Sequence, residues 1–364
     1  MINFEPAAAG DPLVSIILPI RNEARYIARC LDGVLTQDYA RDKIEILVVD
    51  GMSVDDTRKI VARIAAQDPR VRLIDNPEQF VPTALNHGIR LARGTVIIRV
   101  DGHAIIARDY VRRCIDDLAR VEADCVGGPI RTMGETWAAA GIAIAQSSPF
   151  GVGNAAFRYA QHAQYVDTLA FGAYRRGVFD RIGLFDEELI RNQDDEFNYR
   201  LTSQGGKIWL DPEIRSDYFS RASLRALWSQ YLEYGFWKVR VIQKHGRPAS
   251  WRHLIPGAFV LALLGSAAGG VLFNLPLLFL AVVAPYLFAS LTVSFWLAAR
   301  KGPGYLPLLP FAFAAMHLAY GIGFLWGFVR FGLDRPTPTV PQRKSTGSAI
   351  LVEDRLSPES LEKK

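Results

Sequence analysis

The sequence has few cysteines, no block of positive charge and, in one long stretch, no charge at all. Its three cysteines show neither metal-ligand nor redox spacing, so we expect neutral thiols in a reducing compartment. The net charge of +5 is spread thinly, because residues 1–253, 254–329 and 330–364 contribute +1, +2 and +2. A chain without a broad basic face is not expected to bind nucleic acid.

The charge-free stretch covers residues 254–299, which contain no Asp, Glu, Lys or Arg. As a helix these 46 residues would measure about 69 Å, roughly twice the thickness of a hydrocarbon core. Asn274 and Pro276 lie in the middle and favour a turn between two spans. The sequence thus predicts a membrane domain over 254–329, with segments at about 254–274, 276–299 and 305–329. The third segment either crosses fully or is a broken, re-entrant segment.

The two ends of the chain bear on orientation. The first ten residues lack the basic and apolar regions of a signal peptide, and the loop with Arg300 and Lys301 favours the cytosolic side. We therefore expect the polar domain to face the cytosol. Residues 330–364 are rich in Pro, Ser, Lys and Glu, a composition that predicts a disordered tail.

The first hundred residues alternate apolar strands with helices, a pattern typical of an α/β protein with a mostly parallel sheet. We expect strands at Val14–Pro19, Ile44–Asp50, Val71–Asp75 and Thr95–Asp101, and helices at Tyr26–Thr36, about 57–66 and Pro82–Arg93. Ligands of such sheets bind outside the carboxyl ends of the strands. One aspartate after a strand is often only a helix cap, but three strands deliver polar residues to this edge: Pro19–Glu23, Asp50 and Asp101.

Four segments in this order carry a family resemblance: VSIILPIRNEARYI, ILVVDGMSVDDT, PTALNHGIRLARGTVIIRVDGHA and GLFDEELIRNQDDEFNYRL. Together they resemble family 2 glycosyltransferases, and in finer wording the ExoA-like branch that makes succinoglycan-type polysaccharides. The resemblance covers roughly residues 13–240. It implies a GT-A fold over residues 1–218 that takes a nucleotide-sugar donor and inverts the anomeric carbon.

The resemblance also implies a donor site. It assigns nucleotide-sugar binding to Pro19, Arg21, Glu23, Asp50, Gly51 and Asp101, with Asp50 on the base. Asp55 belongs either to this site or to the first turn of the next helix. The role of Arg99, at the same strand end, is left open.

A divalent cation, Mg²⁺ or Mn²⁺, is the implied cofactor, because a diphosphate leaving group develops charge that a metal neutralises. Asp101 and His103 stand two residues apart just beyond a strand, where both side chains reach one ion. His103 replaces the usual second aspartate of the family. Imidazole suits Mn²⁺ better than Mg²⁺, so the identity of the metal stays open.

The general base implied by the resemblance is Asp194, in the segment QDDEFNYRL. At helical spacing Asp194 shares a face with Phe197 and Leu201, while Asp195 points about 100° away. An inverting transfer needs such a carboxylate to deprotonate the acceptor hydroxyl. The alternative is a solvated acidic helix end, which accounts for Asp195 better than for Asp194.

Acceptor binding is assigned more loosely. Arg175 and Arg176 either pair with a phosphate or cap a turn. Residues 219–253 combine aromatic and basic side chains, which favours an interfacial helix on lipid headgroups, with an ordinary surface helix as alternative. In this segment Gln230 to Tyr234 resembles the family's QxxRW motif, although Glu233 and Tyr234 replace its arginine and tryptophan.

Together the resemblance and the apolar segments imply an enzyme of a bacterial inner membrane with its catalytic domain in the cytosol. It would transfer a hexose, glucose from UDP-glucose being favoured, to a polyprenyl-diphosphate-linked saccharide. One alternative is a polyprenyl-phosphate sugar synthase, whose acceptor needs no deprotonation. Another is a non-catalytic, nucleotide-binding membrane partner of a polysaccharide export or synthesis complex.

Overall fold

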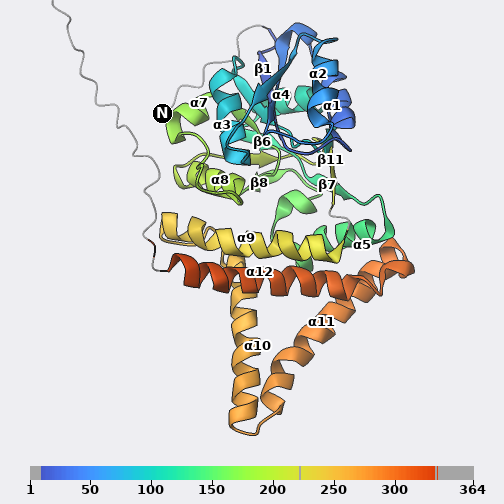
Figure 1. Ribbon diagram of the computed structural model, residues 1–364, viewed down its shortest axis with the longest axis vertical. Helices are drawn as coiled ribbons and strands as arrows, with labels where there is room; N and C mark the ends of the chain where they lie inside the picture. Colours follow the sequence, from blue (N-terminus) through green and yellow to red (C-terminus); the bar gives the residue numbers. More distant parts are fainter. Residues whose placement is uncertain (1–9, 221–222, 333, 335–364) are drawn as a thin grey trace, which may run out of the picture.

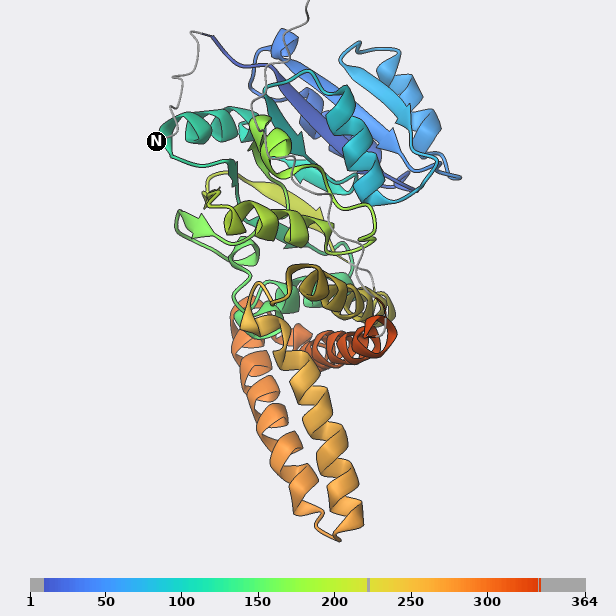
Figure 2. The same ribbon diagram turned by 90° about the vertical axis from the view of Figure 1, so that its left-hand side faces the viewer.

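The computed structural model describes residues 10–220, 223–332 and 334, so the predicted tail lies almost entirely outside it. Figure 1 shows three tiers: a domain built on a sheet, a pair of helices that run beneath it, and a long hairpin of two helices that projects away from both. Figure 2 shows the same order after a quarter turn. The functional cavity lies where the three tiers meet.

The main sheet has eight strands in the order β3-β2-β1-β4-β9-β6-β10-β8. The first four are parallel, as predicted, and β9 is antiparallel to both of its neighbours. A second sheet has the order β5-β11-β7. The strand bounds are β1 Val14–Ile20, β2 Ile44–Asp50, β3 Val71–Asp75, β4 Val96–Arg99, β5 Ala104–Ile106, β6 Cys125–Gly127, β7 Ile130–Met133, β8 Gln164–Val166, β9 Ala173–Arg175, β10 Ile208–Leu210 and β11 Ser216–Phe219.

Helices cover both faces of this sheet (Figure 1). Helix α1 buries Ile27, Leu31 and Val34, which recur at the spacing of one helical face, against the sheet core. The helices of the domain are α1 Ile27–Leu35, α2 Thr57–Ala65, α3 Val81–Leu91, α4 Tyr110–Arg120, α5 Trp137–Gln146, α6 Pro149–Val152, α7 Gly177–Ile182 and α8 Gln193–Ser203. Short 3₁₀ turns, η1 Arg41–Lys43 and η2 Ala156–Arg158, complete it.

The predicted α/β pattern is confirmed in kind and nearly in detail. Strands β2 and β3 have the predicted bounds, and the three predicted helices begin or end within two residues of α1, α2 and α3. The fourth strand ends earlier than predicted, at Arg99. Asp101 therefore lies in the loop before β5, free of the ladder and open to the cavity.

Beneath the domain, α9 (Leu224–His245) and α12 (Leu309–Phe331) lie side by side (Figures 1 and 2). Their backbones are so close that a Cβ atom on Gly323 would collide with the carbonyl of Leu232, and one on Gly235 with that of Tyr320. Only glycine permits this approach, a device common between helices in membranes. Buried side chains of α5, α9, α11 and α12 form a core of their own.

The hairpin consists of α10 (Ile255–Leu272) and α11 (Leu277–Lys301), with a turn at Phe273–Pro276. The turns η3 (Trp251–His253) and η4 (Pro303–Tyr305) lie at its base. All three apolar segments form helices long and apolar enough to cross a membrane. The third of them, α12, lies across the hairpin rather than along it (Figure 1). It is a continuous helix, not the broken segment that its prolines suggested.

Candidate active site

A cavity of about 1170 Å³ opens between the carboxyl edge of the main sheet, helix α9 and the three apolar helices. Most residues that the sequence assigned to the site line it. These are Pro19, Arg21, Glu23, Asp101, His103, Asp194, Gln230 and Tyr234. The same cavity is lined at its other end by apolar side chains of α10, α11 and α12. Charged side chains of the sheet domain and side chains of the apolar helices therefore line one continuous cavity.

At the polar end, His103 and Glu23 form one unit. The Nδ1 atom of His103 lies 2.7 Å from Oε1 of Glu23, and both side chains are about one-fifth exposed. The ring of His103 also packs edge-on against Tyr218 of β11. These contacts fix the imidazole in the loop after β4, within reach of the same space as Asp101.

Arg99 lies between the carboxylates of Asp101 and Asp194 and contacts both. Its Nε atom donates to Oδ1 of Asp101 at 2.9 Å, and its Nη1 atom lies 3.6 Å from Oδ2 of Asp194. Burial disfavours the charged guanidinium, but Asp101 and Asp194 more than offset this effect and raise the pKa of Arg99. The last residue of β4 thereby holds the predicted metal ligand and the predicted base on the same side of the cavity.

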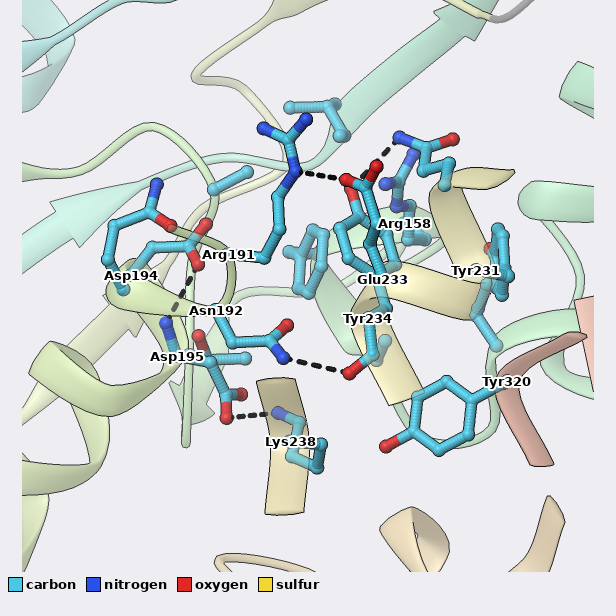
Figure 3. Close-up of a pocket in the computed structure, with 18 of the residues that line it drawn as sticks. Arg158, Arg191, Asn192, Asp194, Asp195, Tyr231, Glu233, Tyr234, Lys238 and Tyr320 are labelled. Atoms are coloured by element: carbon cyan, nitrogen blue, oxygen red, sulfur yellow. Dashed lines mark hydrogen bonds and ion pairs between the residues drawn. The ribbon is translucent and has the colours of Figure 1, made fainter. Parts of the chain in front are cut away.

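Asp194 lies in the first turn of α8, two residues after Asn192, whose left-handed conformation (φ 61°) turns the chain into the helix. Its Oδ1 accepts from the backbone N–H of Asp195, and its side chain is 35% exposed to the cavity. Phe197 and Leu201 are fully buried and anchor the helix to the core beneath the sheet. Asp194 and its neighbour Asp195 both line the cavity, whereas Phe197 and Leu201 do not (Figure 3).

Asp195 and Glu196 have structural partners instead. Asp195 pairs with Lys238 of α9, and Glu196, fully buried, pairs with Arg200 and with His245 of α9. Burial alone would raise the pKa of both carboxyls, but for Asp195 the charge of Lys238, and for Glu196 the hydrogen bonds from His245 and Arg200, hold the pKa below its ordinary value.

Helix α9 differs from the sequence interpretation in what its basic residues contact. Its positive side chains were assigned to lipid headgroups. In the structure, Lys238 pairs with Asp195, Arg240 with Glu188 at 2.5 Å, and Lys244 with Asp186 and Glu188 at 2.6 Å each. Asp195 of α8 and acidic residues of the segment before α8 therefore neutralise these buried cations. These ion pairs join α9 to α8, and contact of α9 with lipid headgroups stays a prediction.

On the acceptor side, Gln230 and Tyr234 lie together on α9, with the Gln230 amide donating to the Tyr234 hydroxyl at 2.9 Å. The backbone carbonyl of Tyr234 accepts from the Asn192 side chain, and Glu233 accepts from Arg191 at 2.7 Å (Figure 3). These contacts connect α9 to the turn just before Asp194.

Arg175 and Arg176 do not reach the cavity. Arg175 donates to the backbone carbonyls of Ala123 and Leu118, and Arg176 donates to those of Ala92 and Gly94. Neither arginine lines the cavity, and these bonds hold the sheet and its loops together. Each guanidinium keeps further N–H donors, so the acceptor assignment of both residues stays a prediction.

Asp50 and Gly51 lie behind the donor wall rather than on it. The Asp50 carboxylate is fully buried and accepts from the Ser53 hydroxyl and from Arg58, at 2.5 and 2.6 Å. A Cβ atom on Gly51 would touch the backbone of Gln79, a residue of the cavity wall. Asp55, left open by the sequence, accepts from the amide and hydroxyl of Thr57 at the start of α2 and from the amide of Ala24.

Three residues of the cavity escaped the sequence analysis. Arg191, in the turn before Asp194, pairs with Glu233, Lys238 pairs with Asp195, and Arg158 also lines the cavity. Arg99 was noticed but given no role. A charged residue at the end of the otherwise apolar run Val96–Ile98 was the one available signal, since arginine is rarely buried without a partner.

The family model for glycosyl transferase family 2 matches residues 15–183, which contain the donor edge of the sheet. The succinoglycan biosynthesis protein ExoA of Rhizobium meliloti (strain 1021) is 31% identical over 325 residues, covering 87% of this chain and 96% of that protein. The chain belongs to glycosyltransferase family 2.

Two further proteins, one compared by sequence and one by structure, are similar over most of this chain. A dolichyl N-acetyl-alpha-D-glucosaminyl phosphate 3-beta-D-2,3-diacetamido-2,3-dideoxy-beta-D-glucuronosyltransferase of Methanococcus voltae is 28% identical, covering 87% of this chain and 97% of that one. The mannosyltransferase PcManGT from Pyrobaculum calidifontis, solved with GDP-Man and Mn²⁺, superposes with a TM-score of 0.57 at 20% identity, covering 88% and 89% of the two chains. This likeness confirms the predicted GT-A fold.

Proposed function

We propose that this family 2 enzyme transfers a hexose, with inversion, from a nucleotide-sugar donor to a polyprenyl-diphosphate-linked saccharide. The carrying observation is the single cavity that has Asp101 and Asp194 at one end and apolar side chains of α10, α11 and α12 at the other. A donor that is fully polar and an acceptor with an apolar tail require such a site. The relatives that act in succinoglycan biosynthesis and on a dolichyl-linked sugar support glycan assembly on a lipid carrier.

In this mechanism Asp194 accepts the proton of the acceptor hydroxyl as its oxygen attacks the anomeric carbon. The bond to the nucleoside diphosphate breaks on the opposite face, so the configuration inverts. Arg99, 3.6 Å from Asp194 and hydrogen-bonded to Asp101, keeps the base in place. We assign UDP-glucose as the donor from the succinoglycan branch, with Pro19, Arg21 and Glu23 on the nucleotide side.

The residues at the donor end fit a divalent cation that is shared with the substrate. Among the described residues no group of three or more His, Cys, Asp or Glu could hold a metal alone. Mg²⁺ and Mn²⁺ in such enzymes are held by one or two protein ligands plus phosphate oxygens, and Asp101 with His103 meets that requirement. When bound, the cation would neutralise charge on the departing diphosphate.

The decisive experiment measures transfer of label from a nucleotide sugar into lipid by the purified protein in detergent. Asp194→Asn should lower the rate by about 10²- to 10⁴-fold, the usual effect of removing a general base. Asp180→Asn, on the exposed face of α7, is the matched control and should transfer normally. Full activity in Asp194→Asn would instead favour a polyprenyl-phosphate sugar synthase, and nucleotide binding without any transfer would favour a non-catalytic partner.

We further propose that the α10–α11 hairpin crosses a bacterial inner membrane, while the catalytic domain, α9 and α12 stay on its cytosolic side. Helix α10 alone measures about 27 Å, close to the hydrocarbon thickness. Arg252 and Arg300 lie at the base of the hairpin and none of the residues at its turn is charged, as the positive-inside rule requires.

Cysteine reporters test this arrangement. A cysteine at Asn274, in the turn, should react with a membrane-impermeant thiol reagent from outside intact cells. Cysteines placed at Lys301 and Arg330 should both react only after the cells are opened. Labelling of the Arg330 position from outside would show that α12 crosses the membrane and would contradict the proposal.

A further inference from the structure

Six arginine and lysine side chains line the cavity, and four of them form ion pairs with carboxylates. Arg99 pairs with Asp101 and Asp194, Arg191 with Glu233, Lys238 with Asp195 and Arg252 with Asp167. The other two, Arg21 and Arg158, have no carboxylate partner within the described part of the chain. Arg21 follows β1 on the donor wall. Arg158 belongs to η2, and among the described cavity residues it is the unpaired arginine that the sequence did not assign to the donor site.

Arg158 ends the turn η2 and is half-buried. Its guanidinium donates to the hydroxyl of Thr132 at 3.3 Å and lies over the ring of Tyr218, 5.7 Å from the centroid. The ring of Tyr218 in turn lies 4.9 Å from that of His103. One aromatic ring therefore separates Arg158 from the donor end of the cavity, and Figure 3 shows it behind Glu233, facing α9.

The segment that carries Arg158 begins at the apolar helices. Phe150 of α6 packs against Tyr286 of α11 and Phe313 of α12, with ring centroids 6.4 and 4.9 Å apart, and its carbonyl accepts from His317 at 2.9 Å. Phe259 of α10 stacks on Tyr286 at 4.6 Å. Phe150, Phe259 and Tyr286 all line the cavity, so we name these three rings the aromatic floor.

We propose that Arg158 binds a phosphate group of an isoprenoid phosphate lipid whose first isoprene units lie on the aromatic floor. A guanidinium that lacks a carboxylate partner matches a phosphate in charge and geometry. A floor that takes two of its three rings from the apolar hairpin, Phe259 and Tyr286, matches a hydrocarbon tail. The proposal rests on the proposed function and deepens it, since it states how the acceptor would be held while its distal sugar reaches Asp194.

Binding to the full-length protein in detergent tests this subsite with three probes: farnesyl diphosphate, inorganic diphosphate and farnesol. The wild type should bind farnesyl diphosphate more tightly than inorganic diphosphate, which lacks the hydrocarbon tail, and more tightly than farnesol, which lacks the phosphates. Arg158→Gln should weaken farnesyl diphosphate at least about tenfold, the cost of losing one charge-assisted contact. The matched control is Arg72→Gln, on the exposed side of β3, which should bind all three probes like the wild type.

A second variant addresses the tail and guards against misfolding of the first. Phe259→Ala should weaken farnesyl diphosphate several-fold and leave inorganic diphosphate unchanged. Equal binding of inorganic and farnesyl diphosphate by the wild type would identify a site for free phosphate and overturn the lipid assignment. Arg158→Gln could instead weaken the binding of UDP-glucose more than that of farnesyl diphosphate, each compared with the wild type. That result would place Arg158 in the donor site and would also overturn the lipid assignment.

The outcome is separable from that of the proposed function. Failure of sugar transfer with intact, Arg158-dependent binding of farnesyl diphosphate would refute the reaction but keep the subsite. Normal transfer by Arg158→Gln with unchanged lipid binding would keep the reaction and refute the subsite.

Discussion

The third apolar helix, α12, and the α10–α11 hairpin have similar hydropathy, but they differ in how much of their surface is buried against the rest of the protein. The mean hydropathy of their most apolar windows is 1.5 for α12 against 1.9 and 2.1 for the hairpin. Within those windows 44% of α12 is buried against protein, but only 11% of either hairpin helix. Hydropathy therefore indicates that a helix is apolar enough to lie in lipid. Whether it contacts lipid or protein depends on the size of the side chains on each of its faces.

The difference in shape comes from small residues. On α12 they recur on the face that meets α9 and α5, where they let whole helices approach. They are Ala312, Ala315, Ala319, Gly323 and Gly327, all buried. Exposed positions of the hairpin instead carry large apolar side chains, such as Leu272 and Phe288. These side chains have no protein partner to pack against in the described chain and suit a hydrocarbon surrounding.

The strongest test removes one large side chain from each region. Phe313→Ala on α12 deletes a fully buried ring from the core shared by α5, α9 and α12, and should cost about 3–5 kcal/mol. Phe288→Ala on α11 deletes a ring that is 74% exposed, and should leave stability in detergent nearly unchanged. Thermal unfolding in the same detergent measures both. Similar losses for the two variants would remove the distinction between the regions.

A smaller effect is expected from adding bulk. Gly323→Leu on α12 drives a side chain into the backbone of Leu232, and overpacking of this kind costs about 1–3 kcal/mol. Gly265→Leu on α10 is the matched control, because nothing lies within 4 Å of its added Cβ atom. We expect a lowered Tm and lost transfer activity only in Gly323→Leu, since α9 positions the turn before Asp194. A tolerated leucine at Gly323 would argue that α9 and α12 do not pack this closely.

The smallest effect concerns the ion pair through which α9 holds the catalytic helix. Lys238→Met leaves Asp195 buried without its cation and should cost about 2 kcal/mol at pH 7. The pKa of Asp195 is lowered in the folded protein, so the pair stabilises fully above the unfolded value of about 3.9. The stabilisation is lost as pH falls through the lower, folded value.

The difference in Tm between wild type and Lys238→Met should therefore shrink between pH 7 and pH 3. Lys59→Met, which breaks an exposed surface pair with Asp56, should show no difference at either pH. A difference for Lys238→Met that does not change with pH would mean that packing of the lysine stem, rather than its charge, stabilises α9.

Much of the donor half was predictable, because it depends on local order. Strand-end residues such as Asp101 and His103 follow directly from alternating apolar runs, and helical spacing separates Asp194 from Asp195. The sequence places Asp50 at a strand end but does not show that Ser53 and Arg58 donate to its carboxylate, and its role on the base stays a prediction. Residues a few positions further along the chain, such as Ser53 and Arg58, can fold back and hydrogen-bond to a carboxylate that would otherwise be available to a ligand. The spacing of residues in the sequence does not reveal such contacts.

What the sequence determined by itself was the family, the order of strands and helices over the first hundred residues, the candidate base and the existence of three apolar segments. Only the tertiary structure decided that α12 lies on α9, that the basic residues of α9 face Asp195 and its neighbours, and that Arg99 joins the two key carboxylates. The physical reason is range. Periodicity and hydropathy act between residues a few positions apart, whereas ion pairs and close helix contacts form between segments tens to hundreds of residues apart that meet only after folding.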